Sequence, residues 1–118
     1  MNHLELLAMR QLFLLSVDEA AYYIAEDGNN EQWIMWERGE REIPLLIVER
    51  FESMNQERRR RIRAIIEKIN NRIGNNTMRS FTDFNDFLSV YTDGDFLEWK
   101  VYQSVANELY SRDLERLC

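Results

Sequence analysis

The sequence predicts an all-α fold, and three observations lead to this prediction. The 118 residues include four glycines and one proline, too few for a turn-rich β-sandwich. Apolar residues recur at spacings of three and four over most of the chain, which is the period of an amphipathic helix. Several of these apolar segments follow a residue that can cap a helix, or precede a turn that contains glycine. A chain of this length holds one domain, or a small module with an extension.

The first two predicted helices cover residues 3–15 and 16–25. Apolar residues at helical spacing predict one inward stripe on the first: Leu4, Leu7, Ala8, Leu12 and Leu15. The second begins at Ser16, which matches Glu19 as a capping box, because the hydroxyl and the carboxylate each bind a free backbone N–H of the first turn. Its inward side chains are predicted to be Ala20, Ala21 and Ile24.

A turn at residues 27–30 precedes the third predicted helix. Asn29 or Asn30 is expected to cap this helix, and Gln32 completes a capping-box-like pattern with Asn29. The helix ends at Gly39, because glycine readily adopts the left-handed conformation of a C-terminal cap. Two of its side chains are expected in the core: Trp33 and Trp36.

Two further helices are predicted in the middle of the chain. Pro44 suits the first turn of one, which carries Leu45, Ile47, Val48 and Phe51. Asn55 is expected to cap the other, which covers residues 56–73 and ends at Gly74. This second helix carries one isoleucine stripe: Ile62, Ile65, Ile66, Ile69 and Ile73.

A loop at residues 74–80, with a short extended piece, precedes the two C-terminal helices. Thr82 is expected to cap the shorter one, which presents Phe84, Phe87, Leu88 and Tyr91. After a turn at residues 92–95, Asp95 is expected to cap the last helix. This helix is predicted to carry one apolar side: Trp99, Tyr102, Val105, Ala106, Leu109 and Leu117.

Composition excludes several kinds of site. Cys118 is the only cysteine and His3 the only histidine, so a disulfide within the chain and a metal centre of paired cysteines or histidines are excluded. The Asp93 and Asp95 pair lacks the remaining ligand spacing of a calcium loop. No nucleophile–base pair or glycine-rich phosphate loop is recognisable, so an enzyme is the least expected class. We expect no metal or cofactor, and the sequence by itself points to no small-molecule ligand. With no apolar run of about 20 residues and no visible signal peptide, the chain is expected to be cytoplasmic.

Charge is distributed unevenly along the chain, whose net charge is −6. Residues 1–53 carry −7, residues 54–80 carry +6 and residues 81–118 carry −5. The basic segment either contacts phosphate or attracts acidic segments of the same chain or of a second copy, and we favour the second interpretation. Its four arginines at 58–61 cannot all face one partner, because consecutive helical residues point about 100° apart. Contact with structured RNA is a weaker alternative for them.

The first three predicted helices have the layout of a helix-turn-helix. The third leaves its N-terminal turn free, and such a turn can approach phosphate and reach base edges in the major groove. Amide side chains there match an adenine edge, a glutamate accepts from the cytosine amino group, and arginines just beyond the helix suit phosphate. The candidate DNA contacts are therefore Asn29, Asn30, Glu31, Gln32, Arg38 and Arg41. A plain helical bundle with two core tryptophans is the alternative.

A motif in the third helix favours the helix-turn-helix. Trp36-Glu37-Arg38-Gly39 resembles the Trp-Glu-x-Gly signature that closes the recognition helix of Cro/Xre-type regulators. In those proteins the glutamate commonly pairs with an arginine near the end of the first helix, where Arg10 stands here. More closely, the chain resembles the YdiL-like family, which includes anti-CRISPR-associated repressors. Three segments carry this resemblance: SVDEAA at 16–21, WIMWERG at 33–39 and WKVYQSVA at 99–106.

The resemblance implies a lambda-repressor-like helix-turn-helix domain at residues 1–53 and a helical dimerisation region at residues 54–118. It implies a homodimeric repressor that binds double-stranded DNA at a near-palindromic operator, with half-sites about 34 Å apart or slightly further. The alternative is a protein-interaction module that has kept this fold and lost DNA binding. The acidic first segment motivates that alternative, as do Glu31, Ile34 and Met35 on the expected groove face.

Overall fold

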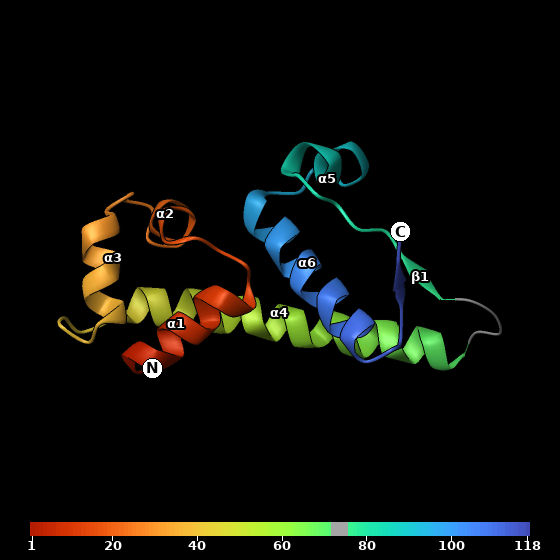
Figure 1. The fold of residues 1–118 in the computed structure, drawn as a ribbon, viewed down its shortest axis with the longest axis horizontal. Coiled ribbons are helices and arrows are strands. Elements are labelled where there is room, and N and C mark those ends of the chain that lie inside the picture. Colours follow the sequence, from red (N-terminus) through yellow and green to blue (C-terminus); the bar gives the residue numbers. More distant parts are fainter. Residues whose placement is uncertain (72–75) are drawn as a thin grey trace. The chain divides into compact units, whose positions relative to one another are not determined.

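The all-α prediction is confirmed by the computed structural model, which describes residues 1–71 and 76–118. Helices dominate these residues, and the strands described are two short ones that pair in a small parallel sheet (Figure 1). The chain divides into two compact units, residues 1–55 and residues 56–118. Within the described ranges, no helix is both long enough and apolar enough to cross a membrane.

The first unit contains four short helical elements and the beginning of a long helix. They are α1 (His3–Leu12), α2 (Val17–Glu19), η1 (Ala20–Ile24), α3 (Asn30–Glu37) and the first part of α4 (Leu45–Asn70). The capping box predicted at Ser16 is confirmed: its hydroxyl accepts from the Glu19 N–H at 3.1 Å, and its own N–H donates to the Glu19 carboxylate at 2.9 Å. The predicted helix continues as a π-helical turn, in which the Ala25 N–H donates to the Ala20 carbonyl.

The core of the first unit is built around aromatic rings from three helical segments. The Trp33 ring centroid lies 5.5 Å from that of Trp36 and 6.1 Å from that of Phe51. Phe13, which caps α1, stacks on Phe51 at 6.3 Å. The prediction that both tryptophans are core residues is confirmed, as is the burial of Ala20, Ala21 and Ile24.

Helix α1 ends earlier and faces the core differently than predicted. It ends at Leu12 because Phe13 forms its C-cap and Leu14 adopts a left-handed backbone with φ of 59°. Leu6 is fully buried, whereas Leu4 is 63% exposed and Ala8 is also exposed, so the prediction that placed Leu4 and Ala8 in the inward stripe was wrong. Helical spacing allows more than one apolar face on α1, and packing against the core selected the face that contains Leu6.

Helix α4 is a single helix where the sequence predicted two. Asn55 lies inside it and caps nothing, so that prediction was wrong. Residues 45–70 contain no glycine or proline, and asparagine inside a helix costs less than about 1 kcal/mol relative to alanine. Pro44 lies just before the helix, where its carbonyl accepts from the Ile47 N–H at 3.0 Å. The predicted end at Ile73 and Gly74 lies outside the described residues.

The second unit contains the remainder of α4 and four further elements. They are β1 (Thr77–Met78), α5 (Phe84–Val90), α6 (Phe96–Ser111) and β2 (Arg116–Leu117). Strands β1 and β2 are parallel, with Thr77 opposite Arg116 and Met78 opposite Leu117. The prediction that Leu117 belongs to the last helix was therefore wrong. Helix α6 ends at Ser111, and Asp113 turns the chain with φ of 58°.

The caps of the two C-terminal helices follow the prediction in one case and differ in the other. Asp95 caps α6 as predicted, because its side chain accepts from the Glu98 N–H at 2.8 Å. Helix α5 is capped by Asp83 instead of Thr82, and the Asp83 side chain accepts from the Asp86 N–H at 2.8 Å. A carboxylate is a strong N-cap acceptor, so the helix begins one residue later than predicted.

Three side chains of α6 hold the extended segment that precedes α5. Trp99 Nε1 and Gln103 Nε2 both donate to the Phe81 carbonyl, at 3.2 and 3.0 Å. The Tyr102 hydroxyl donates to the Arg79 carbonyl at 2.6 Å. Buried carbonyls outside a helix or sheet need such partners. All three donors belong to the segment 99–106, whose sequence therefore has a structural role in this unit.

We expect Asn55→Ala to leave the free energy of unfolding unchanged or to raise it by about 0.5 kcal/mol, because alanine is the better residue inside a helix. The matched control is Asn29→Ala, which removes a true N-cap and should cost about 1 kcal/mol. Urea denaturation followed by far-UV circular dichroism measures both changes. A loss of about 1 kcal/mol from Asn55→Ala would mean that α4 breaks at this residue.

Hydrogen bonds from Arg60 and Arg61 lower the pKa of the Glu57 carboxyl to about 2. We expect an NMR titration of this carboxyl to show a midpoint far below the ordinary glutamate pKa of 4.5. Because the folded pKa is depressed, the carboxylate stabilises the fold above its ordinary pKa of 4.5, and this contribution is lost as the pH falls toward about 2. Glu57→Gln should remove this part of the acid dependence of stability. A Glu57 midpoint at the ordinary value of 4.5 would contradict the expectation.

Candidate nucleic-acid interface

The start of α3 is capped by Asn29. Its side-chain oxygen accepts from the Gln32 N–H at 3.1 Å, so of the two candidates Asn29 is the cap and Asn30 is the first helical residue. The Asn29 N–H donates to Asp27 Oδ1 at 2.9 Å and not to the side chain of Gln32. The capping-box-like prediction was therefore wrong in its second half, and the Gln32 amide is not consumed by the helix end.

The end of α3 is closed by the glycine that the sequence predicts. Gly39 has φ of 74°, and its N–H donates to the Trp36 carbonyl at 3.2 Å. The next N–H, that of Glu40, donates to the Met35 carbonyl at 2.9 Å. This pair of hydrogen bonds is a Schellman motif, which satisfies carbonyls that the helix leaves free. Helix α3 is thus closed at both ends.

A charged cluster fixes α3 against α1. Arg10 donates to both carboxylate oxygens of Glu37, from Nε at 2.7 Å and from Nη2 at 2.9 Å. The two side chains are 16% and 12% exposed. Trp33 Nε1 also donates to Glu37, and Arg10 Nη1 donates to the Leu15 carbonyl at 3.1 Å. The expected pairing of Arg10 with Glu37 is confirmed, and the hydrogen bond to Glu37 raises the pKa of Arg10 above its usual value.

Four of the six candidate DNA contacts gather at one hollow of about 240 Å³. Its lining consists of Asn29, Glu31, Gln32, Met35 and Arg41. The hollow lies at the N-terminal half of α3 and includes Arg41 from the segment that follows the helix. Polar donors, one carboxylate and one guanidinium therefore share a small, concave and partly exposed surface.

The other two candidates, Asn30 and Arg38, are not part of this hollow. Asn30 is half-buried, and its Nδ2 donates to Asp18 Oδ1, which ties the start of α3 to α2. Arg38 is exposed at the C-terminal cap of α3, away from the capped N-terminus. The contact with Asp18 was missed from the sequence, because no local pattern pairs two residues that meet only after the intervening turn is formed.

Apolar atoms also reach the surface of α3. Ile34 is 36% exposed, and Met35 is half-buried beside the polar side chains of the hollow. Trp33 and Trp36, which flank these two residues in the sequence, are buried in the core instead. The exposed side of α3 is therefore mixed in character, with polar groups at its start and aliphatic groups in its middle.

Comparison with known proteins gives two matches. A profile of the Aca2/YdiL-like family matches residues 1–118 of the chain. The Escherichia coli (strain K12) protein that carries the name "Uncharacterized protein YdiL" is 55% identical over 118 residues, which is the full length of both chains. The matched region includes both the helix α3 segment and the α6 segment described above.

We expect Glu37→Gln to lower the free energy of unfolding by about 2 kcal/mol, because it leaves a largely buried guanidinium without its counter-charge. Glutamine keeps the size of the side chain and an acceptor for Trp33. The matched control is Glu31→Gln, an exposed change on the same helix that should stay within about 0.5 kcal/mol of the unmodified chain. Urea denaturation measures both. Equal effects of the two changes would show that the ion pair does not anchor α3.

Proposed function

Since the chain belongs to the Aca2/YdiL-like family, we propose that it is a sequence-specific DNA-binding transcriptional repressor that acts as a homodimer. The order of elements in the first unit supports this proposal. Helix α2 with η1, the turn at residues 25–29 and helix α3 correspond to the two helices and the joint of a helix-turn-helix, with α3 as the recognition helix.

One observation carries the proposal: α3 is held rigidly from behind while its N-terminal half stays accessible. The Arg10–Glu37 ion pair and the two buried tryptophans fix the position of the helix. Glu31 is exposed and Gln32 is half-buried, and both line the hollow at the start of the helix. A recognition helix needs this combination, because base readout requires side chains that are presented at a defined register.

The candidate contacts take different roles in this proposal. Gln32 reads an adenine edge with its amide, and Glu31 accepts from the amino group of a cytosine. Arg38 and Arg41 bind phosphates on either side of the contacted bases, and these contacts set the register without reading sequence. Asn29 contributes its remaining side-chain N–H groups, since its oxygen caps the helix. Asn30 positions the start of α3 instead of contacting a base, because its side-chain amide donates to Asp18.

A homodimer presents two copies of α3 to successive major grooves. The operator is then a near-palindrome with half-sites about 34 Å apart. We assign self-association to the second unit, because the first presents the recognition helix. Repression requires access to the chromosome, so we place the protein in the cytoplasm, and we propose no catalytic role for it.

The second candidate function is a protein-interaction module on the same fold. The exposure of Ile34, with Met35 and Glu31 beside it, favours this alternative, because aliphatic side chains serve a protein surface better than a phosphate backbone. The exposed guanidinium groups of Arg38 and Arg41 favour DNA, and we rank the repressor first for that reason.

The test is fluorescence anisotropy of the full chain against tiled duplexes from the DNA upstream of its own coding region, with excess random duplex present. We expect saturable binding to one near-palindromic tile. Gln32→Ala should weaken binding by about 1–3 kcal/mol and relax the preference at one base pair. Arg38→Ala should weaken binding to all sequences and reduce the slope of log affinity against log salt by about 1.

The matched control is Arg112→Ala, which removes an exposed arginine of the second unit and should leave DNA affinity unchanged. Sedimentation of the free protein and of its complex gives the oligomeric state. Binding to no tile, even at low salt where phosphate contacts are strongest, would reject repression of its own gene. A pull-down with the full chain would then test the protein-interaction alternative.

A further inference from the structure

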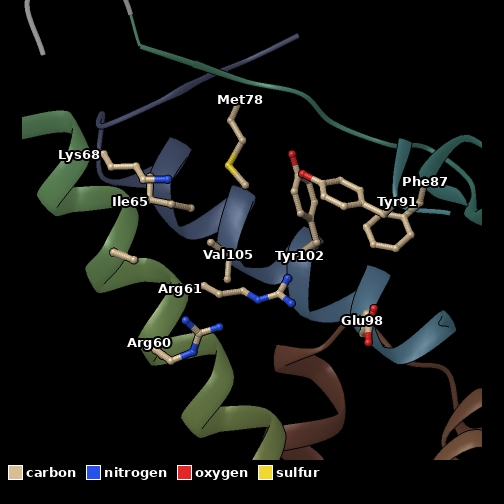
Figure 2. A pocket seen from close by; sticks show the side chains of 11 residues that line it. Arg60, Arg61, Ile65, Lys68, Met78, Phe87, Tyr91, Glu98, Tyr102 and Val105 are labelled. Atoms are coloured by element: carbon tan, nitrogen blue, oxygen red, sulfur yellow. The ribbon is translucent and has the colours of Figure 1, made fainter. Parts of the chain in front are cut away.

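The second unit contains a cavity that DNA binding does not use. It has a volume of about 360 Å³ and is lined by side chains of α4, α5 and α6, together with Met78 of β1 and Tyr91, the C-cap of α5. Figure 2 shows these side chains converging from the different elements. The volume lies in the range of cavities that hold small organic ligands, about 300–1,000 Å³.

One wall of the cavity is aromatic. The ring of Tyr91 stacks on that of Phe87 at 4.9 Å between centroids, and the ring of Tyr102 lies 5.6 Å from Tyr91 (Figure 2). The Tyr102 hydroxyl is held by the Arg79 carbonyl, so this ring has a fixed place in the wall. The thioether of Met78 reaches toward the same space. Aromatic faces and a methionine sulfur together favour a flat aromatic body.

The opposite wall carries the positive charge. Three cations of α4 line the cavity, namely Arg60, Arg61 and Lys68, and among the described residues that line it Glu98 is the one carboxylate. Glu57 orients the two arginines, accepting two hydrogen bonds from Arg60 and one from Arg61. Each guanidinium has five N–H donors, so both retain donors for another acceptor. Lys68 forms no ion pair with any residue that the structure describes.

A second hollow of about 410 Å³ adjoins the cavity, and the two share five lining residues: Ile65, Lys68, Met78, Tyr91 and Tyr102. The second hollow adds Arg79 and Glu115 to the lining. The Glu115 carboxylate belongs to this hollow and does not line the first, where the two arginines lie. An acidic ligand group is therefore favoured beside Arg60 and Arg61, with room for an uncharged body of two fused rings toward the tyrosines.

We propose that this cavity binds a small organic anion with a flat aromatic body. Its carboxylate, sulfonate or phosphate group lies against Arg60, Arg61 and Lys68, and its rings lie between Met78 and the two tyrosines. Arginine binds planar carboxylates through paired hydrogen bonds, which gives this end of the cavity its preference for an anion. Such a site makes the chain a receptor for a small molecule, whether or not it binds DNA.

The test is isothermal titration calorimetry of the full chain with 2-naphthoate and with 2-naphthamide, which has the same rings and no charge. We expect saturable binding of one naphthoate per chain and about tenfold weaker binding of the amide. The double variant Arg61→Met with Lys68→Met should weaken naphthoate binding by about tenfold and leave the amide unaffected. The matched control is Arg63→Met, an exposed change on α4 outside the cavity lining, which should change neither affinity.

A second variant tests whether the compounds bind in the cavity or elsewhere on the surface. Ala64 lines the cavity from an exposed position on α4, so Ala64→Phe should fill the space without loss of the fold, and it should abolish binding of both compounds. Circular dichroism and urea denaturation confirm that each variant is folded. Equal affinity for the acid and the amide, or binding that survives Ala64→Phe, would overturn the proposal. Absence of binding would also overturn the proposal, and this includes the case in which sedimentation shows that a second copy covers the cavity. None of these outcomes bears on DNA binding, which the anisotropy experiment tests separately.

Discussion

The Arg10–Glu37 ion pair is the interaction on which the first unit depends. It joins the end of α1 to the end of α3, and the same carboxylate accepts from Trp33, the fully buried centre of the aromatic core. A charge pair this little exposed is costly to desolvate and tolerates no loss of either partner. The benefit is geometric, because a bidentate contact allows one orientation of α3. The accessible half of that helix is thereby presented in a single register.

A different kind of constraint organises the second unit. There the extended segment before α5 is held by neutral hydrogen bonds. The donors are three side chains of α6, those of Trp99, Tyr102 and Gln103, and the acceptors are backbone carbonyls. These bonds place the segment from 79 to 81 along α6 and keep Tyr102 in the wall of the cavity. The cavity thus has a rigid aromatic wall facing long cationic side chains of α4. Ligand sites commonly combine apolar and aromatic walls with a few charged or polar groups.

Local chemistry explains which secondary-structure predictions were right. Ser16, Asn29, Gly39 and Asp95 each act within one helical turn, so their caps can be read from neighbouring residues. Asn55 has the same side chain as Asn29 but sits between strong helix formers, and the helix continues through it. Capping residues mark where a helix is able to begin, and the flanking residues decide whether it stops.

The sequence by itself determined the all-α class, the family, the ion pair and the polar start of α3, because these follow from composition, spacing and short motifs. Only the tertiary structure decided which face of α1 is buried, with Leu6 inside and Leu4 outside. It also decided that Asn30 is bonded to Asp18 and that cations of α4 face the tyrosines across a cavity. Each of these depends on residues far apart in the chain, whose meeting is set by packing and not by any local preference.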